Sequence, residues 1–402
     1  ELANAFSPAV ADGGFLLGAS AAGSFGAGMG RTVVPLLAVT GLGATPFEVG
    51  VLVAAQTVAF VVIGLPAGAI VDRLRKRRMM IAMDLLRLSL GLTLLGLWLA
   101  GLLGTGLLIA LVALTGCASV FFDVAAMAYL SELVGRAGLG PANGSLQGVS
   151  SATSVGAPAA AGGLVTVIGA ALTAAGSALG YAISAVLLSR IRHCEPGTEA
   201  RPWRLVLADT RDGLRWAVGL RTGRAFTLCT TGVNLALAAR AAVLVIFLLE
   251  LGFDPVEIGI ATAASGAGGV LAAVGPARGG ARGCARLLLW TQAPAVLVPL
   301  AAGSGAAALL LVCLGMAVSS YGATRYNLAQ LTMGQLACPP GMLGAVSASN
   351  RFLVWLTLPV GGLIGGTLAT YLPVAAVLWV TTAVQLASAL PLLRRRERQG
   401  GA

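Results

Sequence analysis

The sequence predicts an all-α membrane protein with twelve transmembrane helices in two six-helix halves. Three observations support this fold class. Hydrophobic residues make up 57% of the 402 residues and charged residues only 10%, whereas a soluble domain carries roughly 25% charged residues. The apolar residues form runs of about 20, the length that crosses a bilayer as a helix, rather than the weak alternation of a membrane barrel. Among the turns, finally, only alternate ones contain basic residues.

The predicted spans follow the chain in order and end at turns that contain glycine, proline or arginine. They cover residues 13–40, 47–71, 79–101, 105–130, 142–167, 169–189, 225–249, 256–275, 285–302, 304–326, 343–369 and 371–393. The polar segment between spans six and seven divides the chain into an N-terminal half (1–189), a central loop (190–224) and a C-terminal half with a basic tail (225–402). The 56 glycines fit this architecture, because small residues let membrane helices approach closely.

The basic residues of the turns fall on one side of the predicted topology. They occupy Arg73–Arg78, Arg136, the central loop, Arg278, Arg282 and the tail Arg394–Arg398. The intervening turns, near Gly41–Thr45, Gly101–Leu103, Leu251–Pro255, Gly303 and Tyr371–Pro373, carry no Lys or Arg. By the positive-inside rule the basic side and both termini are cytoplasmic, which predicts a multi-pass inner (plasma) membrane protein. The stretch Trp203–Trp216 of the central loop is predicted to form a helix along the membrane interface.

A weak internal repeat relates the two halves. Leu111–Ser119 in span four is similar to Leu311–Ser319 in span ten. Two six-helix halves related as repeats are a known plan of transporters, with the substrate site near the bilayer midplane between them. A chance match of small apolar residues is the alternative explanation.

Several function classes are disfavoured by the sequence. It contains no Gly-x-x-x-x-Gly-Lys-Ser/Thr loop, so ATP is not the expected energy source. The six cysteines are scattered and avoid the predicted outer turns, which argues against disulfides and metal sites. The net charge of +11 follows from the one-sided basic turns, so nucleic acid is not an expected partner. The spans hold no cluster of acids, histidines or nucleophiles, and we expect neither an enzyme nor a cofactor.

Several short motifs of the first half carry a family resemblance. They are Gly68-Ala-Ile-Val-Asp72-Arg73-Leu-Arg-Lys-Arg77-Arg78, Asp84-Leu-Leu-Arg87, Phe121-Phe-Asp123, Ser131-Glu132 and Pro141-Ala-Asn143-Gly-Ser-Leu-Gln147. With the first of these the chain resembles the major facilitator superfamily, and the succession resembles its drug–proton antiporter branch, which contains macrolide-efflux and siderophore-export proteins. The resemblance covers most of the first half. The second half matches mainly in layout, as at Asn350-Arg351 and Pro359–Gly362.

The resemblance implies a gate on the cytoplasmic side. In the family, the acid of the loop motif binds near a helix N-terminus of the other half and pairs with the basic residues of the motif. Asp72 and Arg77 would form that latch here, with Gly68, Arg73 and Arg78 beside them. The alternative is that the basic residues of this turn only enforce the topology.

Two further features are candidates for gating. Asp84 and Arg87 are three residues apart, so they share a helix face and can pair, either as a structural ion pair or as part of a gate. Span five contains Gly156-Ala-Pro158-Ala-Ala-Ala-Gly162-Gly163. This segment is similar to the antiporter motif of exporters in the superfamily, although Ala157 stands where glycine is usual. A kinked, closely packed helix is the alternative interpretation of Pro158 and Gly162.

Charged residues inside the spans are the strongest pointers to a binding site, because an ionisable side chain at mid-bilayer costs several kcal/mol. Arg31, Asp123, Arg240 and Arg325 lie in spans one, four, seven and ten. In the resembling fold these four helices line a central cavity, so we predict that the four residues bind substrate. The alternative is that Asp123 pairs with an arginine and braces the bundle.

These observations together predict a secondary transporter. Gln56 and Asn234 are expected to add hydrogen bonds to substrate, unless the backbone satisfies them. Proton coupling, which the resemblance implies, would use Asp123 first and Asp84 second. We predict that a monomer in the lipid bilayer exports a small amphipathic or anionic compound (a drug, siderophore or secondary metabolite) by alternating access, driven by the proton gradient. The alternatives are an uncoupled facilitator and a lysophospholipid or lipid flippase of the same fold.

Overall fold

The computed structural model describes most of the chain. The described residues are 8–63, 67, 70–71, 73–192, 221–273, 289–301, 303, 305–337 and 343–393. The chain divides into two compact units, which are Glu1–Val206 with Asp254–Ala263 (unit 1) and Leu207–Phe253 with Ala264–Ala402 (unit 2). Every element in the described residues is helical, so the predicted all-α fold class is confirmed.

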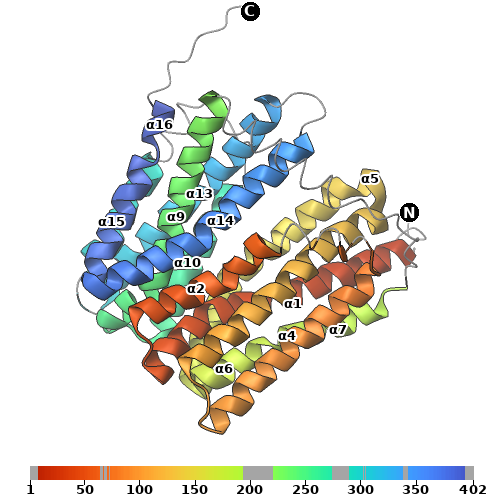
Figure 1. The fold of residues 1–402 in the computed structure, drawn as a ribbon, viewed down its shortest axis with the longest axis horizontal. Helices are drawn as coiled ribbons and strands as arrows, with labels where there is room; N and C mark the ends of the chain where they lie inside the picture. The colour runs from red at the N-terminus through yellow and green to blue at the C-terminus, as the bar shows by residue number, and fades with distance from the viewer. Residues whose placement is uncertain are drawn as a thin grey trace, which may run out of the picture. The chain divides into compact units, whose positions relative to one another are not determined.

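Unit 1 is built around its first helix. Its helices are α1 (Pro8–Leu42), α2 (Pro46–Val62), α4 (Lys76–Leu99), α5 (Thr105–Ile168), α6 (Ala170–Ser177) and α7 (Leu179–Arg190). Helix α1 packs against α2, α5, α6 and α7, while α4 covers α5, α6 and α7 (Figure 1). The N-terminus of α2 is fixed by a capping box, in which Thr45 N–H donates to Glu48 Oε2 at 2.7 Å and Glu48 N–H donates to Thr45 Oγ1 at 3.3 Å.

Unit 2 is built around α9 in the same way. Its helices are α9 (Arg221–Glu250), the short pair η2 (Ala293–Val296) and α12 (Leu297–Leu300), α13 (Ala306–Ala337), α14 (Leu343–Tyr371), α15 (Val374–Ala387) and α16 (Leu390–Leu393). Helix α9 contacts α13, α14, α15 and α16. Helix α10 (Pro255–Ala273) begins in unit 1 and continues into unit 2.

Within the described residues the twelve predicted spans consist mostly of helical backbone, with short turns or breaks such as those at Gly169, Ala178 and Leu372–Pro373. Eight helical segments of the described part are long and apolar enough to cross a membrane. Three shorter apolar helices, at Pro46–Val62, Leu289–Leu300 and Val374–Ala387, add to them. The predicted interfacial helix at 203–216 lies outside the described residues.

Spans four and five differ from the prediction in their connection. The sequence predicts a break near Arg136, whereas helical backbone continues through all 64 residues of α5. A straight helix of that length would measure about 96 Å, yet Ala142 and Leu146 pack against the same buried cluster as Phe122 and Tyr129. The chain therefore turns back within the element. Its two membrane-crossing segments remain distinct, at 105–130 and 148–168.

Small residues set the closest helix contacts in both units. A Cβ added to Gly180 of α7 would lie 3.1 Å from Gly26 Cα of α1. In unit 2, a Cβ on Gly361 of α14 would lie 2.8 Å from Ala238 Cβ of α9. Larger side chains would push these backbones apart, so the glycine content supports close helix packing.

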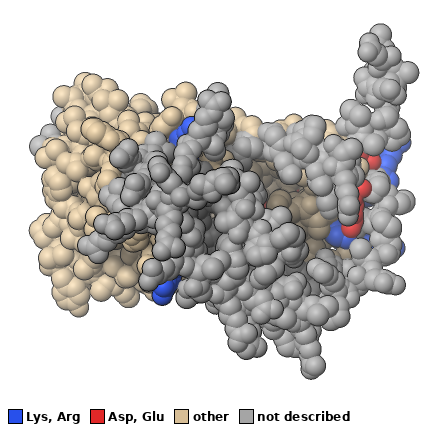
Figure 2. Space-filling view, turned by 90° about the horizontal axis from the view of Figure 1, so that it is seen from above, with Lys and Arg blue, Asp and Glu red and all other residues tan. Residues whose placement is uncertain are grey.

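The surface of the described residues is largely uncharged. On the face shown in Figure 2, Lys, Arg, Asp and Glu side chains occupy only a few places among the described atoms. Large apolar side chains are exposed on several helices, including Leu99 (73%), Val167 (79%) and Trp290 (79%). Such exposure is stable where lipid tails surround the protein, as in a multi-pass membrane protein.

Candidate functional site

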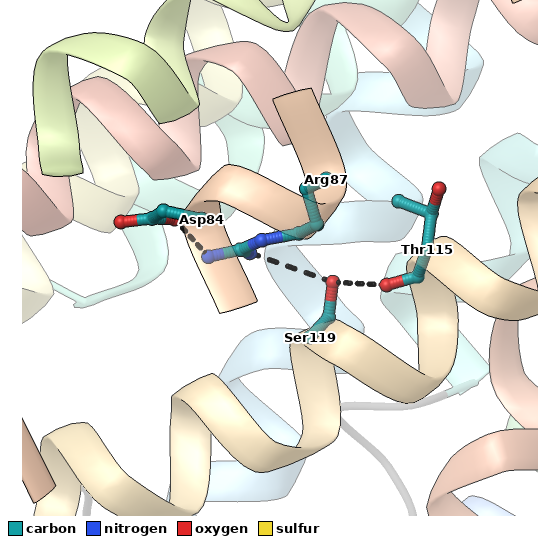
Figure 3. Close-up of polar contacts among 4 residues, drawn as sticks. All are labelled: Asp84, Arg87, Thr115 and Ser119. Atoms are coloured by element: carbon teal, nitrogen blue, oxygen red, sulfur yellow. Dashed lines mark hydrogen bonds and ion pairs between the residues drawn. The ribbon is translucent and has the colours of Figure 1, made fainter. Parts of the chain in front are cut away.

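A buried ion pair forms the centre of the charged site in unit 1. Arg87 Nη2 donates a hydrogen bond to Asp84 Oδ1 on the preceding turn of α4 (Figure 3). The Asp84 side chain is 0% exposed and that of Arg87 is 4% exposed. Burial of two charges is tolerable when they pair closely and hydrogen-bond. The predicted pairing of Asp84 and Arg87 is therefore present in the structure.

Aromatic rings hold the guanidinium of Arg87 in place. Its Cζ atom lies 4.4 Å from the ring centre of Phe122 on α5 and 4.3 Å from that of Tyr181 on α7. Arg87 Nη1 also donates to Ser119 Oγ at 3.5 Å, and this hydroxyl donates to Thr115 O at 2.8 Å (Figure 3). Each cation–π contact is worth about 0.5–2 kcal/mol, with more when water is excluded. Apart from its carboxylate partner, Arg87 of α4 is thus anchored to two other helices, α5 and α7.

Two more predicted residues belong to the same cluster. Tyr181 interacts electrostatically with Arg31 on α1 and Asp123 on α5. It interacts in the same way with Asp84 and Arg87. Arg31 and Asp123 are exposed, in contrast to the buried pair. The cluster has two acids and two bases, so it is electrically balanced when all four groups are ionised.

The basic turn before α4 is organised differently from the prediction. Lys76, Arg77 and Arg78 belong to the first turn of α4 and not to a loop. Positive charge at a helix N-terminus is unfavourable, and two contacts offset that cost. Lys76 Nζ pairs with Glu132 at 2.7 Å, and the Lys76 side chain is 2% exposed. Arg77 Nε and Nη2 donate to the carbonyls of residues 188 and 189 at 2.9 and 2.5 Å, which caps the C-terminus of α7.

The predicted latch is only partly within the described residues. Gly68 and Asp72 lie outside them, so the pairing of Asp72 with Arg77 stays a prediction. Arg73 and Arg78 are exposed. The Lys76–Glu132 pair was missed because Lys76 was read as a topology signal. The available clue was that Lys76 precedes predicted span three and Glu132 follows predicted span four, so both stand at the same end of two neighbouring antiparallel spans.

Pro158 and Gly162 lie on the second membrane-crossing part of α5 and are both buried. There α5 packs on the first turns of α10, within unit 1. A Cβ on Gly162 would lie 3.0 Å from Gly259 Cα, and one on Gly259 would lie 2.8 Å from Pro158 O. This geometry fits a closely packed helix, which was the alternative to an antiporter motif at Pro158 and Gly162. A gating role for these two residues stays a prediction.

The remaining predicted residues lie on helices α2, α9 and α13. Gln56 is half-buried on α2, where the backbone passes close to Gly116 of α5. Asn234 Nδ2 donates to Thr230 O of its own helix at 2.8 Å, so the backbone satisfies it. Arg325 is half-buried on α13. Arg240 on α9 is 8% exposed, and its Nη1 has no hydrogen-bond partner among the described residues.

Comparison with known proteins connects this arrangement to transporters. A family model described as the Major Facilitator Superfamily matches residues 16–357. The crystal structure of the nucleoside transporter NupG is similar with a TM-score of 0.77 at 13% identity, covering 96% of this chain and 100% of that one. The inward-facing crystal structure of a bacterial homologue of the iron transporter ferroportin has a TM-score of 0.73 at 16% identity. The match covers 95% of this chain and 98% of that one.

A third similar structure is a bacterial homologue of the human lysosomal transporter Spinster, inward-facing and unoccupied. Its TM-score is 0.72 at 14% identity, and the match covers 95% of this chain and 96% of that one. At these identities the likeness shows the fold alone. No curated protein matches the sequence.

Proposed function

Because this chain belongs to the major facilitator superfamily, whose model matches residues 16–357, we propose that it is a proton-coupled secondary transporter that exports a small amphipathic or anionic compound. The similar structures named for a nucleoside and an iron transporter support a small solute as cargo. The observation that carries proton coupling is the buried pair of Asp84 and Arg87 inside a span.

Asp84 carries the proton in this proposal. Its carboxylate is fully buried beside Arg87, and that pairing favours the ionised form. Protonation removes the attraction, while the aromatic rings keep hold of the guanidinium. The cluster around Tyr181, which includes the exposed Arg31 and Asp123, then changes from neutral to positive. A shift in this balance is a physical means of linking proton uptake to a change of conformation.

The proposed membrane location and orientation follow from the distribution of basic residues among the turns. Every basic turn falls on one side of the twelve spans, which supports an inner-membrane protein with both termini in the cytoplasm. We propose a monomer as the working unit, since one chain supplies both six-helix halves.

Transport in proteoliposomes tests the proposal. Purified protein is reconstituted, a pH gradient is imposed, and export is screened over anionic and amphipathic compounds. We expect gradient-driven export by the wild type and at least about a tenfold loss in Asp84→Asn. Exchange of substrate without a gradient should persist in this variant, because it needs no proton. Glu250→Gln, which changes an exposed acid at the end of α9, is the matched control.

Two outcomes would contradict the proposal. Export by Asp84→Asn equal to that of the wild type, at equal protein levels, would exclude Asp84 and leave Asp123 as the remaining candidate. Export by the wild type that ignores the pH gradient would instead support the uncoupled facilitator.

A further inference from the structure

An isolated buried arginine is the unusual feature of unit 2. Arg240 lies well inside the apolar span Thr227–Glu250 of α9. It is 8% exposed, and its Nη1 has no hydrogen-bond partner in the part of the chain that the structure describes. A charged group in this position is destabilising by several kcal/mol unless another group compensates it.

The helix that carries Arg240 supplies no such group. One turn to either side on the same face lie Ala236, Val243 and Leu244, which are 2%, 0% and 8% exposed. All three side chains are aliphatic and cannot accept a hydrogen bond. The guanidinium therefore emerges from an apolar stripe of α9.

The sequence of the C-terminal half also offers no suitable carboxylate. Helix α9 contains one acid, the exposed Glu250 at its end, which is about 15 Å away along the helix axis. The only acids between Glu250 and the tail residue Glu397 are Asp254 and Glu257. Those two cap α10, because Asp254 N–H donates to Glu257 Oε2 at 2.9 Å and Glu257 N–H donates to Asp254 Oδ1 at 2.8 Å.

Unit 1 handles its buried arginine differently. There Arg87 pairs with the carboxylate of Asp84, and its guanidinium packs against two aromatic rings. An arginine cannot relieve its charge by losing a proton, unlike a lysine or a histidine. The compensating charge at Arg240 must accordingly come from an anion that the C-terminal half does not supply.

Close packing fixes the position of Arg240 on α9. A Cβ on Gly365 of α14 would lie 2.7 Å from Ala239 Cα, directly before the arginine. Gly361, one turn earlier on α14, packs as closely on Ala238. A side chain held by a rigid helix pair is already oriented for its ligand, which lowers the entropic cost of binding.

We propose that Arg240 is a binding site for an oxyanion, a carboxylate or a phosphate, and that the exported substrate carries this group. The planar guanidinium can hold either group through two parallel hydrogen bonds, which a lysine cannot reproduce. The assignment of the anion to the substrate rests on the transport function proposed above. The site itself does not, because it follows from the burial of Arg240 and from the lack of a suitable acid in the sequence of the C-terminal half.

Thermal unfolding of the full chain in detergent, at constant ionic strength, tests the site without a membrane or a gradient. The probes are benzoate, its neutral analogue benzyl alcohol, and inorganic phosphate. We expect benzoate to raise the Tm in a saturable way and benzyl alcohol to have no such effect. A shift with phosphate as well would mean that the site accepts a free oxyanion and not only an amphipathic carboxylate.

Three variants test whether the Tm shift with benzoate depends on Arg240. Arg240→Lys should weaken benzoate binding about tenfold to a hundredfold, because it keeps the charge but loses the paired hydrogen bonds. Arg240→Met should abolish the shift and, without anions, be at least as stable as the wild type, since it removes an uncompensated buried charge. Arg224→Met, at an exposed arginine of the same helix, should keep the full shift.

The outcomes separate this inference from the transport proposal. Equal shifts with benzoate and benzyl alcohol, no shift with benzoate or phosphate, or a full shift in Arg240→Met would each overturn the anion site. An Arg240→Met protein that is less stable than the wild type without anions would show that the arginine is structural. Export that does not depend on the pH gradient would contradict the proposal of proton-coupled transport and would leave the anion site unaffected.

Discussion

The ion pair between Asp84 and Arg87 can be tested by removing one side at a time. Their side chains are 0% and 4% exposed, so either single change leaves a buried charge without its counter-ion, at a cost of about 3–5 kcal/mol. The double variant Asp84→Asn/Arg87→Gln buries no charge and loses chiefly the contacts with Phe122 and Tyr181, about 0.5–2 kcal/mol each. The two single changes should therefore sum to well above the cost of the double change, with a coupling energy of at least about 2 kcal/mol.

Reversible unfolding in mixed detergent micelles, followed by tryptophan fluorescence, measures the free energies of unfolding for this double-mutant cycle. A second cycle that combines Asp12→Asn with Arg87→Gln serves as the control, since Asp12 accepts a hydrogen bond from the backbone of Arg192 instead. That cycle should be additive within about 0.5 kcal/mol. A double variant as unstable as the sum of its singles, or a wild-type-like Arg87→Gln, would refute the assignment of a buried pair.

Two further predictions concern other contacts. Lys76→Met should destabilise unit 1 by about 1–3 kcal/mol, because Glu132 loses its partner at 2.7 Å, and Lys76→Met/Glu132→Gln should recover part of the loss in the same unfolding assay. Gly361→Ala should reduce the yield of folded protein in size-exclusion chromatography, because its Cβ would lie 2.8 Å from that of Ala238, whereas Gly96→Ala, with no neighbouring atom within 4 Å, should behave as the wild type. Equal behaviour of the two alanine variants would contradict close packing at Gly361.

The fold was predictable because lipid imposes a simple rule on the sequence. A chain in hydrocarbon must satisfy its backbone within helices, so long apolar runs mark the spans. The connection within α5 was not predictable, since helical backbone persists through the polar residues near Arg136. Hydropathy reports where a helix leaves the membrane and not whether it stops being helical.

The charged site was predictable only in its local part. Asp84 and Arg87 are one turn apart, so their pairing followed from helix geometry. The rings of Phe122 and Tyr181 come from distant parts of the sequence, and nothing in the local pattern places them on the guanidinium. Long-range contacts of this kind arise from helix packing, which periodicity does not encode.

The two proposed sites together have an electrical consequence. If a monoanion bound at Arg240 leaves the cell as one proton enters through Asp84, each cycle moves two positive charges inward, and a membrane potential of 100 mV would contribute about 4.6 kcal/mol per cycle. We therefore expect export to accelerate under a potassium diffusion potential set by valinomycin, negative on the side that holds the substrate, with no pH gradient present. A neutral analogue of the substrate should gain only half of that driving force. Export that is indifferent to the potential would mean that the anion and the proton leave on the same side and cancel, and the exchange mechanism would then be wrong.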